Sequence, residues 1–334
     1  MQRISLLARS ALAGVAVCAA LLVAGCGSGT TERNKGPGQG NVSKGAKTFV
    51  MVPKGVHPYY EPCYEGFKDA AAKYGVNVDF QAANAFEVPQ QVQVIENLIA
   101  RKVDGIALSA LDDQGLVNVI DEAKKAGIKI ITFDAPAPSS SALCYIGTEN
   151  EAAGRAGGEA IAKLMGGEGE VAVLQGGLAA PNLNDRFKGF EKVLKEKAPN
   201  IKIVAREDTQ GRPNITADKT EALLQAHPNL KAVFSVSAEG VPGAVAVLKD
   251  QKKTDKVILA GFDDLKDTLE GIRAGTVRFC IVQRTYKMGW LSIEKLLAAC
   301  EGKELPKQID TGVVIVTKDN VDTYMQDMKK EFAK

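Results

Sequence analysis

The chain has 334 residues, of which 45% are hydrophobic and 25% are charged, as is ordinary for a globular protein. This length predicts two domains, each long enough to bury a core of its own. The formal net charge is only +2 and no basic cluster appears, which argues against nucleic-acid binding because that usually needs a basic stripe. No zinc-type spacing appears either, so we expect no metal site.

The N-terminus, residues 1–25, has the features of an export signal. Arg3 and Arg9 precede an apolar run over residues 11–24, and small residues precede Cys26. The run is too short for a comfortable membrane-spanning helix. The sequence Leu-Val-Ala-Gly-Cys that ends at Cys26 resembles the bacterial lipobox, whose cysteine is lipidated and becomes the new N-terminus. We therefore expect a lipid anchor at Cys26; the alternative is an ordinary signal peptide with a cysteine there by chance.

Residues 26–46 are rich in glycine, serine and lysine and are predicted to form a flexible tether that does not pack. Export of the part beyond it would permit disulfides. Its cysteines allow more than one full pairing and form no C-x-x-C motif, so free buried cysteines and bridges both stay open. These cysteines are Cys63, Cys144, Cys280 and Cys300.

From residue 47 onward, apolar runs of strand length alternate with stretches of helical periodicity. Val92, Ile95, Leu98 and Ile99, for example, follow the spacing of one face of a helix. Strand–helix alternation with short connections predicts βαβ units and a parallel sheet. The predicted strands of this first lobe are 48–52, 76–80, 104–109, 128–133 and 143–147.

The alternation then starts afresh, which predicts a second lobe of similar design. A helix over 151–165 ends at a glycine pair, and further strands and helices follow it. After Gln283, a helix over 286–299 and a strand over 312–316 remain. The sequence therefore predicts an α/β protein with two doubly wound parallel-sheet lobes. The predicted strands of the second lobe are 170–174, 201–205, 231–235, 256–260 and 277–282.

Polar residues follow nearly every predicted strand. In open α/β sheets, ligands bind outside the carboxyl ends of the strands, where such residues gather. The stretch His57-Pro-Tyr-Tyr60 follows the first strand, and its rings would form one wall of a polar cleft. The other polar segments are 109–113, Asp134, 175–185, 208–210, 235–239, 263–264 and 283–284.

The chain resembles the bacterial extracytoplasmic sugar-binding proteins of the ribose-binding type, which serve ABC importers. The motifs run in family order from Lys47 almost to the end of the chain. They are His57-Pro58-Tyr59-Tyr60, Ile131-Thr-Phe-Asp134, Asp185-Arg-Phe-Lys-Gly-Phe190, Ala226-His-Pro228 before Ala232-Val-Phe234, Gly261-Phe-Asp263 and Phe279-Cys-Ile-Val-Gln283.

This resemblance implies the periplasmic binding protein type I fold, in which two lobes joined by a three-segment hinge close on a ligand. The crossings would lie near Thr148, Gln283 and Gly312. The implied N-terminal lobe is 47–148 plus 284–311, and the implied C-terminal lobe is 149–283 plus 312–334.

The resemblance also implies roles for individual residues. Tyr59 and Tyr60 match paired aromatic residues that sandwich the sugar ring. Asp134 matches a carboxylate that accepts from two sugar hydroxyls, and Arg186 matches an arginine that donates in a fork to adjacent oxygens. The other expected ligand contacts are His57, Ser237, Asp263, Gln283 and Lys54.

Three departures from the ribose pattern argue against ribose itself. Ala135 stands where that pattern has an arginine, Ser237 stands where it has an asparagine, and residues 209–212 lack the aromatic that often covers the sugar. Lys54 is more similar to the relatives that bind the autoinducer-2 furanosyl signal or rhamnose, which remain the alternative.

Other functional classes fit the sequence less well. Asp134 and Asp263 could form the acid–base pair of a glycoside-processing enzyme, but no G-x-S-x-G elbow and no Ser-His-Asp set appears. Sugar-sensing repressors share the fold but carry an N-terminal DNA-binding headpiece, where this chain has an export signal. We therefore expect a lipid-anchored, monomeric binding protein that is not an enzyme, needs no cofactor and faces the periplasm or the cell exterior. Its partners would be a monosaccharide or similar neutral polyol and the permease and ATPase of an ABC importer.

Overall fold

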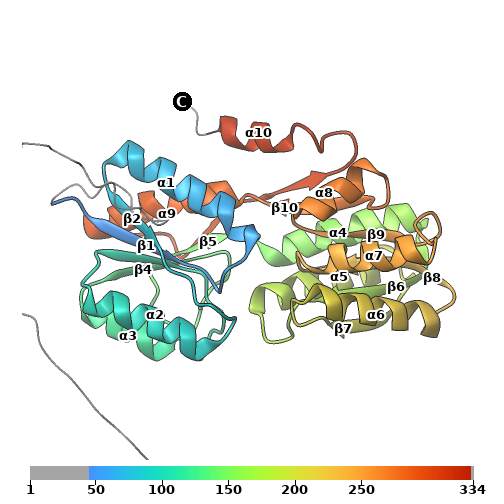
Figure 1. The fold of residues 1–334 in the computed structure, drawn as a ribbon, viewed down its shortest axis with the longest axis horizontal. Helices are drawn as coiled ribbons and strands as arrows, with labels where there is room; N and C mark the ends of the chain where they lie inside the picture. The colour runs from blue at the N-terminus through green and yellow to red at the C-terminus, as the bar shows by residue number, and fades with distance from the viewer. Residues whose placement is uncertain (1–44, 332–334) are drawn as a thin grey trace, which may run out of the picture. The chain divides into compact units, whose positions relative to one another are not determined.

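Two six-stranded sheets organise the protein, whose computed structural model describes residues 45–331 (Figure 1). The first sheet has the order β11-β5-β4-β3-β1-β2, and all its neighbouring strands are parallel. Its strands are β1 (Thr48–Val52), β2 (Asn77–Phe80), β3 (Gly105–Leu108), β4 (Lys129–Phe133), β5 (Tyr145–Gly147) and β11 (Gln308–Asp310).

The second sheet repeats this design with the order β12-β10-β9-β8-β6-β7. Its strands are parallel except that β12 runs antiparallel to β10. They are β6 (Glu168–Gln175), β7 (Asn200–Asp208), β8 (Leu230–Ser235), β9 (Ile258–Phe262), β10 (Phe279–Gln283) and β12 (Val313–Val316).

Helices cover both faces of each sheet, which is why the central strands are continuous apolar runs rather than alternating ones. On the first sheet, α1 (Glu61–Tyr74) and α9 (Thr285–Cys300) share one core cluster, while α2 (Val88–Ala100) and α3 (Val117–Lys125) share the other. On the second sheet, one face carries α4 (Asn150–Met165) and α5 (Pro181–Lys197). The opposite face carries α6 (Pro213–Ala226), α7 (Gly240–Asp250), α8 (Lys266–Arg273) and α10 (Tyr324–Lys330).

The chain crosses between the two sheets after β5, after β10 and between β11 and β12. Hydrogen bonds join these crossings to one another. Thr148 Oγ1 donates to Gln283 Oε1 at 3.0 Å, and Asp310 Oδ1 accepts from the backbone N–H groups of Glu149 and Gly312 at 3.0 and 2.9 Å. The predicted fold class, two parallel-sheet lobes with three crossings, is confirmed.

The sequence pattern missed one strand, β11, which pairs with β5 at the edge of the first sheet. Its three residues, Gln308–Asp310, are mostly polar and largely exposed, so they form no apolar run. In β6 and β7, the structure extends the predicted strands at both ends. The ladder of backbone hydrogen bonds, which hydrophobicity does not report, sets those ends.

The cysteines that the structure describes are free: Cys63, Cys144 and Cys280 are buried and Cys300 is partly buried. Cys26 and the predicted export signal lie outside the described residues. Within residues 45–331, no helix combines the length and the apolar character needed to cross a membrane.

Candidate ligand-binding site

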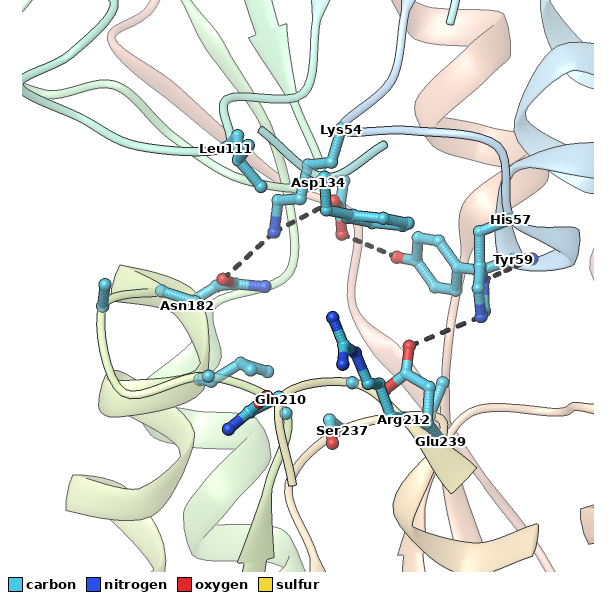
Figure 2. A pocket seen from close by; sticks show the side chains of 18 of the residues that line it. Lys54, His57, Tyr59, Leu111, Asp134, Asn182, Gln210, Arg212, Ser237 and Glu239 are labelled. Carbon is cyan, nitrogen blue, oxygen red and sulfur yellow. Dashed lines mark hydrogen bonds and ion pairs between the residues drawn. The ribbon is translucent and has the colours of Figure 1, made fainter. Parts of the chain in front are cut away.

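A cavity of about 930 Å³ lies between the carboxyl ends of the two sheets. Side chains from both lobes line it (Figure 2). All the ligand contacts expected from the sequence lie in its wall: Lys54, His57, Tyr59, Tyr60 and Asp134 from the first lobe, and Arg186, Ser237, Asp263 and Gln283 from the second.

Asp134 is the centre of the hydrogen-bond network on the first lobe. Its Oδ1 accepts from the Tyr59 hydroxyl at 2.9 Å, and its Oδ2 accepts from Ser109 Oγ at 2.6 Å and from the Tyr60 hydroxyl at 3.2 Å. Lys54 Nζ lies 3.8 Å from the same Oδ2. A buried carboxylate needs such partners, and a carboxylate offers about four acceptor positions. One acceptor position, on Oδ1, is therefore left for a ligand hydroxyl.

Tyr59 and Tyr60 reach Asp134 from a single turn of 3-10 helix, η1 (Pro58–Tyr60), which His57 caps. Both rings are buried in the core of the first lobe and meet edge to face, with ring centroids 5.1 Å apart. Burial, reinforced by the Asp134 carboxylate, raises the pKa of both hydroxyls well above its ordinary value. The two tyrosines are therefore neutral donors to Asp134, and their stacking on a sugar stays a prediction.

Asp263 faces the cavity from the second lobe. Gln283 Nε2 donates to both of its oxygens, at 3.1 and 3.2 Å, and Arg186 Nη1 lies 3.9 Å from Oδ2. Burial raises the pKa of Asp263 to about 7, although the Arg186 guanidinium opposes this shift. Asp263 is therefore only partly ionised at neutral pH, and a ligand that stabilises its carboxylate form would drive its ionisation.

Arg186, on α5, is almost fully buried, with 2% of its surface exposed. Its Nε donates to Asn150 Oδ1 at 2.9 Å, its Nη1 donates to the Val236 carbonyl at 3.0 Å, and its guanidinium lies over the Phe262 ring at 4.3 Å. Within the described residues, Nη2 has no hydrogen-bond partner. An unpaired buried donor costs about 1–3 kcal/mol, so this nitrogen is the group that a ligand oxygen would satisfy.

Ser237 offers a second buried group of this kind on the same lobe. Its Oγ is without a hydrogen-bond partner among the described residues, and the side chain lines the cavity. Arg186 Nη2 and Ser237 Oγ are therefore two buried polar atoms of the same lobe that lack a hydrogen-bond partner among the described residues. Both residues line the cavity, where a ligand could supply that partner.

Two glycines allow the close packing that holds Arg186 in place. A Cβ atom at Gly154 of α4 would lie 1.9 Å from the Arg186 carbonyl oxygen, and one at Gly189 of α5 would lie 2.0 Å from the Glu151 carbonyl oxygen. The helices α4 and α5 can approach this closely only because both positions lack a side chain. This contact brings Asn150, at the start of α4, within reach of the Arg186 guanidinium.

Two side-chain contacts span the cavity from one lobe to the other (Figure 2). Lys54 Nζ lies 3.5 Å from Asn182 Oδ1, and His57 Nε2 lies 3.4 Å from Glu239 Oε1. Sequence reasoning did not single out Asn182 or Glu239, although both lie in polar segments that follow predicted strands. Their position beside a helix N-terminus was the available signal, but many other polar residues in those segments share it.

The outer part of the cavity was also missed. Phe86, Leu111 and Leu178 line it together with the longer polar side chains of Gln210 and Arg212. Phe86 supplies an aromatic ring to this part of the cavity. The sequence motif had placed the covering aromatic within residues 209–212, which contain none. Phe86 lies in a loop of the first lobe, outside every motif that carried the resemblance.

A family model described as a periplasmic binding protein domain matches residues 48–304. The chain belongs to this family. Periplasmic binding proteins lie outside the cytoplasm, and the resemblance that we inferred from the sequence motifs is thereby confirmed.

Several proteins that are similar to this chain are named for the sugars they bind. The D-allose-binding periplasmic protein of Escherichia coli is 26% identical over 272 residues, which cover 78% of this chain and 87% of that protein. The ribose import binding protein RbsB of Bacillus subtilis is 24% identical over 262 residues, which cover 78% of this chain and 84% of that protein. Both alignments cover most of the two proteins.

Solved structures of sugar-binding proteins are also similar to this chain. A solute-binding protein of an ABC transporter from Burkholderia graminis, in complex with D-arabinose, has a TM-score of 0.81 and 40% identity. The alignment covers 84% of this chain and 99% of that one. GanP, a glucose-galactose binding protein from Geobacillus stearothermophilus, has a TM-score of 0.80 and 29% identity, with 84% of this chain and all of that one covered.

Proposed function

We propose that the protein captures a monosaccharide, or a similar neutral polyol, between its two lobes and delivers it to an ABC importer. The observation that carries this proposal is that each lobe presents a buried carboxylate to one shared cavity, Asp134 from the first and Asp263 from the second. Such carboxylates accept strongly from hydroxyl groups. The sugars named for the relatives support the proposal.

The hydrogen-bond donors and acceptors that line the cavity suggest how a sugar would be held. Asp134 would accept from one hydroxyl through Oδ1, and Asp263 would accept from others on the opposite side of the ring. Arg186 Nη2 and Ser237 Oγ would bind ring or hydroxyl oxygens, because both atoms are buried and unpaired in the part of the chain that the structure describes. Gln283 would support this arrangement by holding Asp263 in position.

The charges favour a neutral ligand. Lys54 and Arg186 lie beside Asp134 and Asp263, so the formal charges of the inner cavity roughly cancel when both carboxylates are ionised. A sugar phosphate would add negative charge next to two carboxylates, and no phosphate loop was found in the sequence to offset it. A neutral sugar lets each charged group form a hydrogen bond without repulsion.

Capture would proceed by closure of the two lobes. A sugar that touches residues of both lobes makes all its contacts only in the closed form, so it shifts the open–closed population by its differential affinity. The moving bodies would be residues 47–148 with 284–311, and residues 149–283 with 312–334. The hinge would consist of the segments around Thr148, Gln283 and Gly312.

The protein would act as a monomer, without catalysis or a cofactor, held at the membrane by lipid on Cys26 and serving a permease and an ATPase. A ligand of the autoinducer-2 or rhamnose type is the second candidate, since Lys54 reaches the Asp134 carboxylate inside the cavity. A glycoside-processing or sugar-sensing role ranks below it.

A sugar panel tests the proposal directly. Purified protein is heated with each of a set of pentoses, hexoses, polyols and their phosphates, because a ligand that binds only the folded state raises the melting temperature. We expect at least one neutral sugar to do so, and calorimetry then gives its affinity. Tighter binding of a sugar phosphate than of its parent sugar, or no stabilisation by any neutral sugar, would contradict the proposal.

A further inference from the structure

We infer that His57 and Glu239 form a latch between the two lobes, and that His57 holds the cleft closed instead of contacting the ligand. This inference concerns the cleft of the proposed function and uses its ligand as one readout. It reassigns a residue that the family resemblance had placed among the ligand contacts.

Both ring nitrogens of His57 are already engaged. Nδ1 accepts from the backbone N–H of Tyr59 at 3.1 Å, which caps the turn η1. A nitrogen that accepts carries no proton, so this hydrogen bond assigns the proton of the neutral ring to Nε2. Nε2 lies 3.4 Å from Glu239 Oε1, across the cavity. Nδ1 is therefore engaged by the Tyr59 N–H and Nε2 faces the Glu239 carboxylate, so neither nitrogen is left for a sugar hydroxyl.

Glu239 is free to make this contact. It occupies the N-cap position of α7, but its side chain makes no capping hydrogen bond. The positive end of the α7 dipole favours its negative charge. Among the residues that the structure describes, His57 is the polar group that the Glu239 carboxylate meets.

The contact is partly shielded from water. The side chains of His57 and Glu239 are 19% and 20% exposed, and the Phe86 ring packs edge-on to the imidazole with centroids 6.5 Å apart. A polar contact to a carboxylate in such a setting contributes more than an exposed ion pair, because water screens it less. In Figure 2 it lies apart from the Lys54–Asn182 contact, which is to its left, so two separate contacts join the lobes across the cavity.

Opening the cleft must break the latch, because His57 follows β1 in the first lobe and Glu239 follows β8 in the second. The latch therefore favours the closed form whether or not a sugar is bound. Its loss should speed sugar release while leaving the association rate almost unchanged. For one partly shielded polar contact to a charged group, we expect the affinity to fall about threefold to tenfold.

The first experiment is a double-mutant cycle with His57→Asn and Glu239→Ala in the full protein. Asparagine retains the capping of η1, because it is among the best N-cap residues, but it is too short to reach Glu239. We expect each single variant to weaken sugar binding equally, mainly through faster release, and the double variant to bind no more weakly than either single one. Glu207→Ala is the matched control: its carboxylate pairs with Lys219 of the same lobe at 2.8 Å, and sugar binding should not change.

The outcomes separate the alternatives. If His57 contacts the sugar itself, His57→Asn weakens binding, Glu239→Ala leaves it unchanged, and the latch is overturned. If the wild type binds no sugar, the proposed function fails, but small-angle scattering of the ligand-free proteins still tests the latch. The latch requires a larger radius of gyration for both variants than for the wild type and for Glu207→Ala; in that case, equal radii would overturn it.

Discussion

Asp134 and Asp263 occupy the same position in the two sheets. They follow β4 and β9, which are each the third strand in the order of their sheet. Each has a left-handed backbone, with φ of 59° and 63°, and each donates its N–H to the neighbouring strand, to the carbonyl of Ile146 at 3.1 Å and of Ile281 at 2.9 Å. Such a conformation costs a non-glycine residue on the order of 1–3 kcal/mol, and aspartate tolerates it better than most.

The two carboxylates differ in what surrounds them. Asp134 accepts from three hydroxyl groups and lies near a lysine. Asp263 has an amide and a more distant guanidinium as partners, and burial raises its pKa to about 7. The same backbone position thus carries two carboxylates with different hydrogen-bond partners, one in each lobe.

Removing either carboxylate should weaken sugar binding strongly. A hydrogen bond to a charged group contributes about 1.5–3 kcal/mol, so Asp134→Ala and Asp263→Ala should each weaken binding by roughly 10- to 150-fold. Asparagine at either site should cost less, because its amide oxygen still accepts one bond. Titration calorimetry on the ligand found in the sugar panel measures this, and an alanine variant that binds like the wild type would remove that residue from the site.

Sugar affinity should rise with pH through neutrality. The raised pKa of Asp263 means that a proton competes with the ligand hydroxyl until the pH exceeds about 7. Arg186, Asp264 and Asp134 are the charged groups that influence this pKa. Calorimetry from about pH 5.5 to about pH 8.5 should show tighter binding at the alkaline end. Asp263→Asn, which cannot ionise, should lose this dependence, and a wild type with flat affinity would contradict the assignment.

The stability of the ligand-free protein should follow the opposite trend. The folded pKa of Asp263 is about 7, whereas an unfolded aspartate titrates near about 3.9. Between these values the folded state binds more protons, so the free energy of unfolding should fall as the pH rises from about 4 to about 7. Asp263→Asn should reduce this loss when denaturant unfolding is compared at the two pH values. An identical pH dependence in both proteins would show that Asp263 is not its source.

The hinge bond from Thr148 to Gln283 should tune the site. Thr148→Val keeps the shape of the side chain but removes the hydroxyl that donates to Gln283 Oε1 at 3.0 Å. Gln283 then lacks a partner that orients its amide towards Asp263, and we expect sugar binding to weaken about threefold to tenfold. The matched control is Thr311→Val, because the Thr311 hydroxyl is buried in another crossing without a partner among the described residues. This control should leave binding unchanged; equal losses in both variants would indicate a general hinge effect.

Lipid attachment at Cys26 is tested by fractionation. We expect the wild type to sediment with membranes and Cys26→Ser to be released, since two acyl chains suffice for firm anchoring whereas one does not. Equal release of the two proteins into the soluble fraction would exclude the anchor.

Much of the architecture was accessible from the sequence, because burial on both faces makes a parallel strand a continuous apolar run. Residues 48–52 show this, and β1 has those bounds. Asp134, Arg186, Asp263 and Gln283 could be nominated because they lie in motifs at or beside strand ends, and the structure brings them to one cavity. The strand β11 escaped because its polar residues gain their place by pairing with β5 rather than by hydrophobic burial.

Tertiary structure alone decided which side chains meet. The tyrosine hydroxyls that follow β1 point at Asp134, and His57 meets Glu239 of the other lobe. These partners are separated by 74 residues or more along the chain, so no local periodicity links them. Strand and helix patterns are local properties of a sequence and can be recognised there. The hydrogen bonds that occupy Arg186 Nε and Nη1, and so leave Nη2 without a partner among the described residues, depend on packing within the second lobe, whereas the His57–Glu239 contact depends on how the two lobes meet. Only this packing determines which groups remain for a ligand.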